Sequence, residues 1–494
     1  MGCSSKDGQC KGSCSTAAPT DEIKLFAKQE RIYPKKVKGT YRNLKWVAMV
    51  VCLAFYYLAP FIRWDRGPNA PDQAILIDLV KGRAYWFWFE IWPQEVYILT
   101  GILVVAAIAL FFVTSLFGRV WCGFFCFQTV WTDLFVWVER LIQGDSFKRK
   151  KLHESPWTFE KFYKLGATYL SWLAISWVTA GSFVLYFNDA PTLVRNFFEF
   201  NVSSTVLAFI IGLTSSTYIL AGFAREQVCT YMCPYARFQS AMFDKDTLII
   251  SYDQKRGEPR GKHKKGEDWS GLGDCVDCTA CVQVCPTGID IRDGLQMECI
   301  ACGLCIDACD DIMDKVGLPR GLIAYHTERY FDERQNEKSA KTDKAEKFHF
   351  IRPRTIYYSV ILCVVASAML YTLISRSPLE LAVLHDRNPL FVKLSNGNIR
   401  NGYDIKILNK THDHRHYTIG VEGIGNASIK LNAAGEVTTD NIYVEADSVG
   451  HYKVFVESGI QPQQPFDIDF YIIDNQTGQK VKHETMFITQ RSQE

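Results

Sequence analysis

The 494-residue chain has no cysteine after Cys363, although it contains 17 cysteines in all. It has no C-x-x-C-H haem attachment motif and no G-x-G-x-x-G loop after a strand, so nothing indicates a covalent haem, a nicotinamide or a flavin. Its formal net charge of +2 gives no argument for nucleic-acid binding. The first forty residues show neither the apolar core nor the cleavage site of a secretory signal.

Eight cysteines between residues 275 and 309 form two runs with the same spacing, C-x2-C-x2-C-x3-C. This spacing is typical of two [4Fe–4S] clusters, in which the fourth cysteine of each run binds the cluster of the other run. Zinc sites and disulfides also use cysteine, but neither explains the repeated three-residue rhythm. We therefore predict cluster 1 on Cys275, Cys278, Cys281 and Cys309, and cluster 2 on Cys299, Cys302, Cys305 and Cys285.

Long apolar runs alternate with charged stretches along the chain. Five runs are long enough to cross a membrane as helices, namely Leu44–Ile62, Val96–Phe117, Ala167–Phe187, Thr205–Ala224 and Thr355–Ile374. A further apolar stretch, Trp121–Ile142, contains Asp133 and Glu139, and it is predicted to be a re-entrant or surface helix, with a full span as the alternative. Residues 63–95 are predicted to be a loop with tryptophans at the lipid headgroups, namely Trp64, Trp86, Trp88 and Trp92.

The distribution of lysine and arginine predicts the orientation. Residues 1–43 hold nine of these side chains and residues 118–166 hold eight, whereas residues 63–95 hold four and residues 188–204 hold one. We therefore expect the N-terminus and the predicted clusters in the cytoplasm. The C-terminal part, which has no cysteine, is expected outside, and this agrees with reduced thiols on the cytoplasmic side.

Beyond Ser375 the sequence changes to short stretches of alternating apolar and polar residues, separated by Gly, Asn and Asp. Eight such stretches in about 110 residues predict a β-sandwich of immunoglobulin type. The expected fold is thus a polytopic α-helical membrane protein of about five spans, with an inserted bacterial-type 2[4Fe–4S] ferredoxin-like domain and a C-terminal immunoglobulin-like β-sandwich. Its predicted parts are a basic cytoplasmic arm (1–43), a membrane domain with four spans (44–250), the ferredoxin-like domain with charged linkers (251–353), a fifth span (354–375) and the periplasmic β-domain (376–494).

Two further cysteine pairs, both C-x3-C, follow the second and fourth predicted spans. Residues four apart share one face of a helix, so each pair can present two sulfurs to one metal. Soft thiolates favour Cu(I), zinc or iron–sulfur clusters over hard cations. A packing role for small apolar residues is the alternative, but two equal spacings at equivalent depth favour a copper or redox site on Cys122, Cys126, Cys229 and Cys233.

Other candidate ligands carry weaker signals. Three N-terminal cysteines are either metal-capturing thiols or ordinary tail residues, namely Cys3, Cys10 and Cys14. Cys52 and Cys363 lie within predicted spans, where a free cysteine packs as a small hydrophobe. On a strand, alternating histidines would share one face and present a metal site or a solvated edge, and this pattern is formed by His412, His414 and His416.

The order of these parts resembles the CcoG/FixG/RdxA family, accessory proteins of cbb(3)-type cytochrome oxidase. The resemblance extends over nearly the whole chain and includes RIYPKKVKGTYRNL (31–44), WPQEVYILTG (92–101), GRVWCGFFCFQTVWTDLF (118–135), CTYMCPYARFQSAMFD (229–244), GIDIRDGLQMECIACGLCIDACD (288–310) and DRNPLFVKLSNGNIRNGY (386–403). One departure is Phe127, where the family usually has proline after the second cysteine of the pair.

The resemblance implies a role in maturing the oxidase at a bacterial inner membrane, with reduction of Cu(II) to Cu(I) as the proposed chemistry. In that hypothesis an unidentified cytoplasmic donor reduces the clusters, and copper near the two C-x3-C pairs accepts the electron. The oxidase subunits or copper chaperones would then receive Cu(I). A quinone-linked respiratory subunit and a non-catalytic, redox-sensing assembly scaffold are the alternatives.

Overall fold

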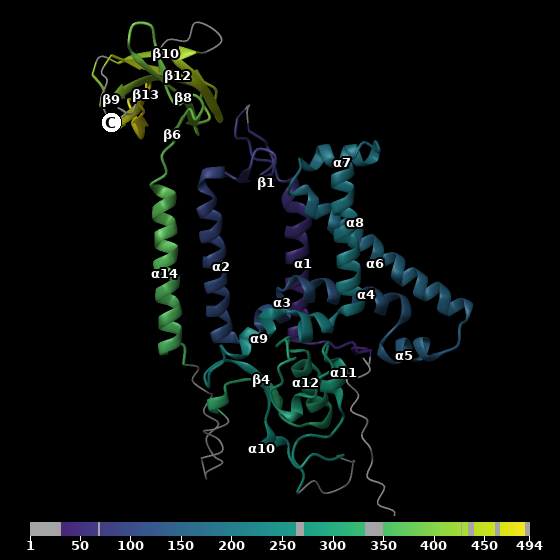
Figure 1. The fold of residues 1–494 in the computed structure, drawn as a ribbon. Coiled ribbons are helices and arrows are strands. Elements are labelled where there is room, and N and C mark those ends of the chain that lie inside the picture. The colour runs from purple at the N-terminus through teal and green to yellow at the C-terminus, as the bar shows by residue number, and fades with distance from the viewer. Residues whose placement is uncertain are drawn as a thin grey trace, which may run out of the picture.

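The computed structural model describes residues 31–67, 70–262, 271–330, 349–425, 427–432, 439–459 and 465–489. Three layers follow one another along the molecule in Figure 1. A β-sandwich with the C-terminus lies at one end, a set of long helices forms the middle, and a compact α/β unit lies at the other end. The predicted ligands Cys3, Cys10 and Cys14 lie outside the described residues.

Within the described residues, five helices are long and apolar enough to cross a membrane, and they match the five predicted spans. Their apolar side chains remain largely exposed, since the fifth helix has no buried residue in its most apolar window. A helix that is apolar on all sides and exposed in the folded chain is typical of lipid contact. The five are α1 (Thr40–Leu58), α2 (Val96–Phe117), α6 (Phe159–Leu185), α8 (Ser204–Ile219, continued by η3, Leu220–Ala224) and α14 (Pro353–Ile374).

The stretch predicted as a re-entrant or surface helix consists of two helices, α3 (Val120–Phe124) and α4 (Phe127–Gln143), and neither is a candidate span. Asp133 and Glu139 are buried on α4, but both are paired with arginine. Helix α4 crosses the lower ends of the long helices in Figure 1. The remaining short helices of this layer are α5 (Ser146–Glu154), α7 (Ala190–Phe198), η4 (Val228–Met232) and α9 (Pro234–Ser240).

The segment between the first two spans contains a small antiparallel sheet that the sequence did not predict. Its strands are β1 (Ile75–Asp78), β2 (Arg83–Trp86) and β3 (Phe89–Ile91), in the order β1-β2-β3. The expectation that Trp92 lies at the headgroups is wrong, because its side chain is only 2% exposed. The guanidinium of Arg83 lies over the Trp92 ring at 3.6 Å, so this tryptophan packs within the protein through a cation–π contact.

The ferredoxin-like unit begins earlier than predicted. Residues at the start of the expected linker form β4 (Ile249–Tyr252), which pairs with β5 (Ile323–His326) and closes the unit. Ile250 and Ile323 are buried in its core together with Cys275, Cys281 and Cys309, so both strands are part of the folded unit and not of a linker. Between the strands lie α10 (Gln254–Gly257), α11 (Ala280–Val284), η5 (Ile291–Asp293) and α12 (Leu304–Val316).

The C-terminal unit is a sandwich of two antiparallel sheets, as predicted. One sheet has the order β10-β12-β8-β6 with β7 beside β8, and the other has the order β11-β9-β13-β14. Alternate residues of β8 and β13, such as Tyr403, Ile405 and Phe470, fill the core between the sheets. The strands are β6 (Leu379–His385), β7 (Val392–Lys393), β8 (Ile399–Asn409), β9 (Arg415–Glu422), β10 (Ser428–Asn432), β11 (Ile442–Val444), β12 (Ser448–Ser458), β13 (Phe466–Asp474) and β14 (Lys480–Phe487). Strand β6 is the one that the alternation did not indicate.

Candidate functional site

The two cysteine runs of the ferredoxin-like unit have the same backbone geometry. In each run the second and fourth residues after the first cysteine have left-handed backbone, with φ of 51° at Asp277, 53° at Thr279, 51° at Ala301 and 74° at Gly303. Three of these residues are not glycine, so the conformation is imposed by the fold. Successive N–H groups in such a turn form a concavity that suits anions, including iron–sulfur clusters. The repeated turn therefore fits a cluster in each run.

The fourth cysteine of the second run lies beside the first run. Cys309 is on α12, and it shares a buried core with Cys275 and Cys281. Burial, and then the charges of Cys281, Asp310, Cys278 and Cys275, raise the pKa of the Cys309 thiol to about 12. The fold thus brings together the four residues that we predicted for cluster 1.

The cysteines of the second set also lie close to one another. Burial raises the pKa of the Cys299 thiol to about 12, and the neighbouring Cys302 and Cys285 raise it as well. The pKa of the Cys305 thiol is raised by burial and then by Cys302, Cys299 and Cys285, in that order. Cys285 therefore faces the second run, as the crossed prediction for cluster 2 requires.

Four further cysteines converge where the membrane layer meets the ferredoxin-like unit. Cys122 lies on α3 and Cys126 directly precedes α4, while Cys229 lies on η4 and Cys233 directly precedes α9. Burial raises the pKa of the Cys229 thiol to about 12, and Cys126, Cys122 and Cys233 contribute in the same direction. The two pairs are thus neighbours in space, although about 100 residues separate them in the chain. We call them the four-cysteine group.

The four-cysteine group packs directly against the ligand loop of cluster 2. Cys122 and Cys229 contact a core that contains Cys302 and Leu304. At Gly123 the approach is so close that a Cβ atom would lie 2.8 Å from the carbonyl oxygens of Ile300 and Ala301. No side chain separates α3 from this loop at that point.

Two polar residues that the sequence did not single out hold this contact together. The Arg119 guanidinium donates to the carbonyl oxygens of Met297, Ala236 and Cys299, the last at 3.3 Å. It therefore joins the ligand loop to α9 and to the start of α3. Gln239, which is fully buried on α9, donates from Nε2 to the Cys122 sulfur at 3.3 Å. Only a three-dimensional neighbourhood identifies these two residues, because neither belongs to a spaced motif.

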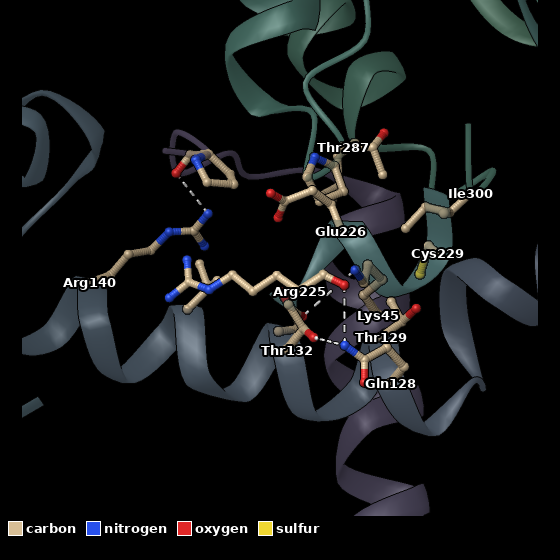
Figure 2. Close-up of a pocket in the computed structure, with 15 residues that line it drawn as sticks. Lys45, Gln128, Thr129, Thr132, Arg140, Arg225, Glu226, Cys229, Thr287 and Ile300 are labelled. Atoms are coloured by element: carbon tan, nitrogen blue, oxygen red, sulfur yellow. Dashed lines mark hydrogen bonds and ion pairs between the residues drawn. The ribbon is translucent and has the colours of Figure 1, made fainter. Parts of the chain in front are cut away.

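A small cavity lies beside Cys229, between α1, α4 and the cluster 2 loops (Figure 2). Its volume is about 50 Å³, enough for water-sized solutes. Its lining is mainly apolar but includes the charged residues Lys45, Arg225 and Glu226, of which Lys45 lies nearest Cys229 in Figure 2. The Gln128 amide donates to the Arg225 carbonyl at 3.2 Å and fixes one wall.

In the described part of the chain, no group of three or more His, Cys, Asp or Glu side chains is arranged to hold a single metal ion. The four thiolates of a [4Fe–4S] cube each bind a different iron, so they need not converge on one point. The expected alternation of three histidines on one strand is not realised, because His412 and His414 precede β9 and only His416 lies on it. His416 Nδ1 is 2.6 Å from Asn441 Oδ1.

Comparisons with known proteins agree with this arrangement. A family model described as "4Fe-4S dicluster domain" matches residues 224–328, "4Fe-4S binding domain" matches residues 99–144, and "IG-like fold at C-terminal of FixG" matches residues 369–490. The second of these matches contains Cys122 and Cys126 of the four-cysteine group.

Curated relatives match over most of their length. "Nitrogen fixation protein FixG" of Rhizobium meliloti is 45% identical over 87% of this chain and 87% of its own length. "Protein RdxB" of Cereibacter sphaeroides is 45% identical over 96% of this chain and 99% of its own length. "Protein RdxA" of the same organism is 44% identical over 87% of this chain and 90% of its own length.

Proposed function

The chain belongs to the FixG and RdxA family, and from this premise we propose that it is a membrane electron-transfer protein that reduces Cu(II) to Cu(I) in cbb(3)-type oxidase assembly. The observation that carries the proposal is the direct packing of the four-cysteine group against the ligand loop of cluster 2. An electron delivered to the ferredoxin-like unit would cross this contact to reach copper held near the four thiols, although no three of them converge on one point among the described residues.

Two [4Fe–4S] clusters are the cofactors that the iron–sulfur family matches support. We propose Cys275, Cys278, Cys281 and Cys309 as the ligands of cluster 1, and Cys299, Cys302, Cys305 and Cys285 as those of cluster 2. When bound, each cluster supplies one electron at a time. The protein's part is to bury the ligand sulfurs, to present N–H groups in the left-handed turns, and to hold cluster 2 against the membrane layer.

The four-cysteine group is the proposed copper site. Reduction of Cu(II) to Cu(I) takes one electron and leaves a soft ion, which thiolates prefer over the oxygen ligands of harder cations. Burial raises the pKa of the Cys122 thiol to about 11 and that of Cys229 to about 12, and the Arg119 cation opposes this only in part, so metal binding would release the protons of these thiols. The electron comes from a one-electron reductant of the ferredoxin class on the side of the clusters.

The proposed topology follows the lysine and arginine distribution. The N-terminal segment and the ferredoxin-like unit would lie in the cytoplasm, and the β-sandwich would lie in the periplasm, separated by the five spans. The four-cysteine group would then lie at the cytoplasmic membrane surface. Oxidase subunits or copper chaperones are the proposed acceptors of Cu(I).

The test is anaerobic mixing of the purified, chemically reduced full-length protein with Cu(II), with a Cu(I)-specific chelator present. Iron–sulfur absorption and Cu(I) formation are followed together. We expect loss of cluster reduction to match Cu(I) formation mole for mole. The quadruple variant C122S/C126S/C229S/C233S should retain its iron but form Cu(I) at least tenfold more slowly.

The matched control is C52S/C363S, which replaces the cysteines of α1 and α14. It should reduce Cu(II) at the wild-type rate. Equal rates in the quadruple variant and the wild type would overturn the copper site. Clusters that stay reduced with Cu(II) but are oxidised by a quinone would instead support the respiratory alternative.

A further inference from the structure

We propose that a basic pocket at the junction of the N-terminal segment, α1 and α4 binds the phosphate headgroup of an anionic phospholipid. The pocket has a volume of about 470 Å³. It lies at the end of the spans that carries the ferredoxin-like unit, where α1 begins at Thr40. Six residues define its chemistry, namely Lys36, Lys38, Arg42, Arg140, Trp46 and Trp137.

The charge of the lining selects an anion. Arg42 is neutralised, because its Nη1 donates to both Asp133 carboxylate oxygens at 2.9 Å. Among the described residues, no carboxylate forms an ion pair with Lys36, Lys38 or Arg140. Three cations thus lie around one pocket with no direct ion pair to a described carboxylate.

Asp145, the acid that lines the pocket, offsets one of these positive charges and leaves an excess. Asp145 Oδ1 accepts from the backbone N–H of Lys36 at 3.0 Å and of Ser146 at 2.8 Å, so the carboxylate starts α5 and fixes the N-terminal segment. Arg140 donates from Nη2 to the Pro34 carbonyl at 3.1 Å, which is a neutral acceptor. Burial, and then Arg149 and Arg42, lower the pKa of Arg140 to about 10 against the opposing charges of Asp133 and Asp145.

The other wall is aromatic and faces the apolar part of the molecule. Trp46 and Trp137 meet edge to face with 6.0 Å between ring centroids, and the Arg42 guanidinium lies 4.5 Å from the Trp46 ring. Trp137 is 40% exposed and the neighbouring Leu141 is 72% exposed. Tryptophan at the end of a membrane-spanning helix is typical of the lipid headgroup level. Basic pockets between membrane helices bind anionic headgroups. A ligand with both a phosphate and an apolar part fits this lining better than free phosphate.

The pocket is also connected to the ferredoxin-like unit. The backbone N–H of Arg42 donates to Asp307 Oδ2 at 2.7 Å, and that of Tyr41 donates to Asp307 Oδ1 at 3.2 Å. Asp307 lies on α12, two residues before the proposed cluster 1 ligand Cys309. A lipid in the pocket would therefore brace the start of α1 against both α4 and α12.

The experiment measures lipid binding to the full-length, cluster-loaded protein by native mass spectrometry, with phosphatidylglycerol and phosphatidylcholine as probes. We expect the wild type to bind phosphatidylglycerol at least tenfold more tightly than phosphatidylcholine. In K36Q/K38Q the affinity for phosphatidylglycerol should fall about 25-fold, since each basic side chain near an anionic lipid surface contributes roughly a fivefold factor. Both lysines are exposed, so the substitution should leave iron content and melting temperature unchanged.

The matched control is K150Q/K151Q on α5, which makes the same change of charge outside the pocket and should bind as the wild type does. Trp137→Ala separates lipid from free phosphate, because it should weaken phosphatidylglycerol binding and leave any binding of inorganic phosphate unaffected. Equal binding of the two lipids by the wild type would overturn the proposal. So would unchanged binding in K36Q/K38Q, or full competition by inorganic phosphate at the concentration of the lipid.

Discussion

Each proposed cluster is completed by one cysteine that belongs to the other cysteine run. Cys285 ends the first run but faces the second, and Cys309 ends the second run but faces the first. The crossing ties α11 and α12 into one core, so each cluster would hold both halves of the unit together. Loss of Cys285 or Cys309 should therefore affect the cluster whose other three ligands lie in the opposite run.

This crossing is testable by comparing single substitutions. C309S and C275S should remove or alter the same cluster, whereas C285S and C299S should affect the other one, because each pair shares a cluster. Each variant should retain about half of the wild-type iron, and electron paramagnetic resonance of the reduced protein should give two classes of spectrum. A spectrum of C285S that matches that of C275S would contradict the crossed assignment.

Glu139 is a buried carboxylate of α4 whose charge is compensated by several arginines. Its carboxylate is 1% exposed and forms ion pairs with Arg31, Arg149 and Arg225 at 2.8–3.0 Å. Burial alone would raise its pKa, but the arginines outweigh burial and hold the pKa below the ordinary value. Residues 31–39, predicted as the end of a flexible arm, are fixed in part by the Arg31 contact.

Glu139→Gln should destabilise the protein by roughly 3–5 kcal/mol, because removal of one partner leaves buried arginines without compensation. The melting temperature of the detergent-solubilised protein measures this effect. Glu154→Gln is the matched control, since Glu154 is 67% exposed and its distance to Lys150 is 4.0 Å. It should change stability by less than about 1 kcal/mol. Equal melting temperatures for the two variants would show that the buried cluster adds no stability.

At the level of elements, α3 joins the membrane layer to the ferredoxin-like unit. It is a helix of five residues between two apolar segments. Because Gly123 has no side chain, α3 packs closely against the loop of residues 300–302. A short helix of this kind has little stability of its own, so its position depends on the packing around it. The distance between the four-cysteine group and the loop of cluster 2 should thus depend on this one residue.

Gly123→Ala should force α3 and the loop apart, since its Cβ would lie 2.8 Å from two backbone oxygens that cannot rotate away. We expect a loss of roughly 1–3 kcal/mol of stability and an altered signal from cluster 2 only. Gly166→Ala on α6 is the control, because a Cβ there meets no atom within 4 Å. Identical cluster spectra for G123A and G166A would contradict a tight contact at this point.

At the scale of the whole molecule, ion pairs join the β-sandwich to the membrane layer. Arg83 of β2 binds Asp447 at 2.6 Å, and Lys410 of the sandwich binds Glu95 at 2.7 Å. Glu90 of β3 also faces Asp447. Burial, and then the Asp447 charge, raises the pKa of the Glu90 carboxyl to about 7 against the opposing effect of Arg83 and Arg66.

The contact between β3 and the sandwich should therefore weaken as the pH rises. The folded state keeps a proton on Glu90 that the separated state loses above its ordinary pKa of 4.5, so stability falls between about pH 4.5 and pH 7 and is constant above. Hydrogen exchange of β1–β3, corrected for its intrinsic pH dependence, should quicken roughly tenfold between pH 5.5 and pH 7.5. Glu90→Gln should abolish the change, and an unchanged profile in this variant would assign the effect to another group.

The sequence by itself determined the features that depend on local pattern. The spacing of eight cysteines, the length of five apolar runs and the alternation of most strands each lie within a short stretch of chain, so they can be read without the fold. The same is true of the family resemblance, which rests on contiguous motifs.

Tertiary structure decided what depends on contacts between distant residues. It brought Cys122 beside Cys302, paired Glu139 with three arginines, buried Trp92 under Arg83, and folded residues 75–91 into a sheet. A buried carboxylate and an exposed one have the same letter in the sequence. What distinguishes Glu139 is its set of partners, which lie from 10 to 108 residues away in the chain. For that reason the polar residues Arg119 and Gln239 and the basic pocket emerged only from the folded chain.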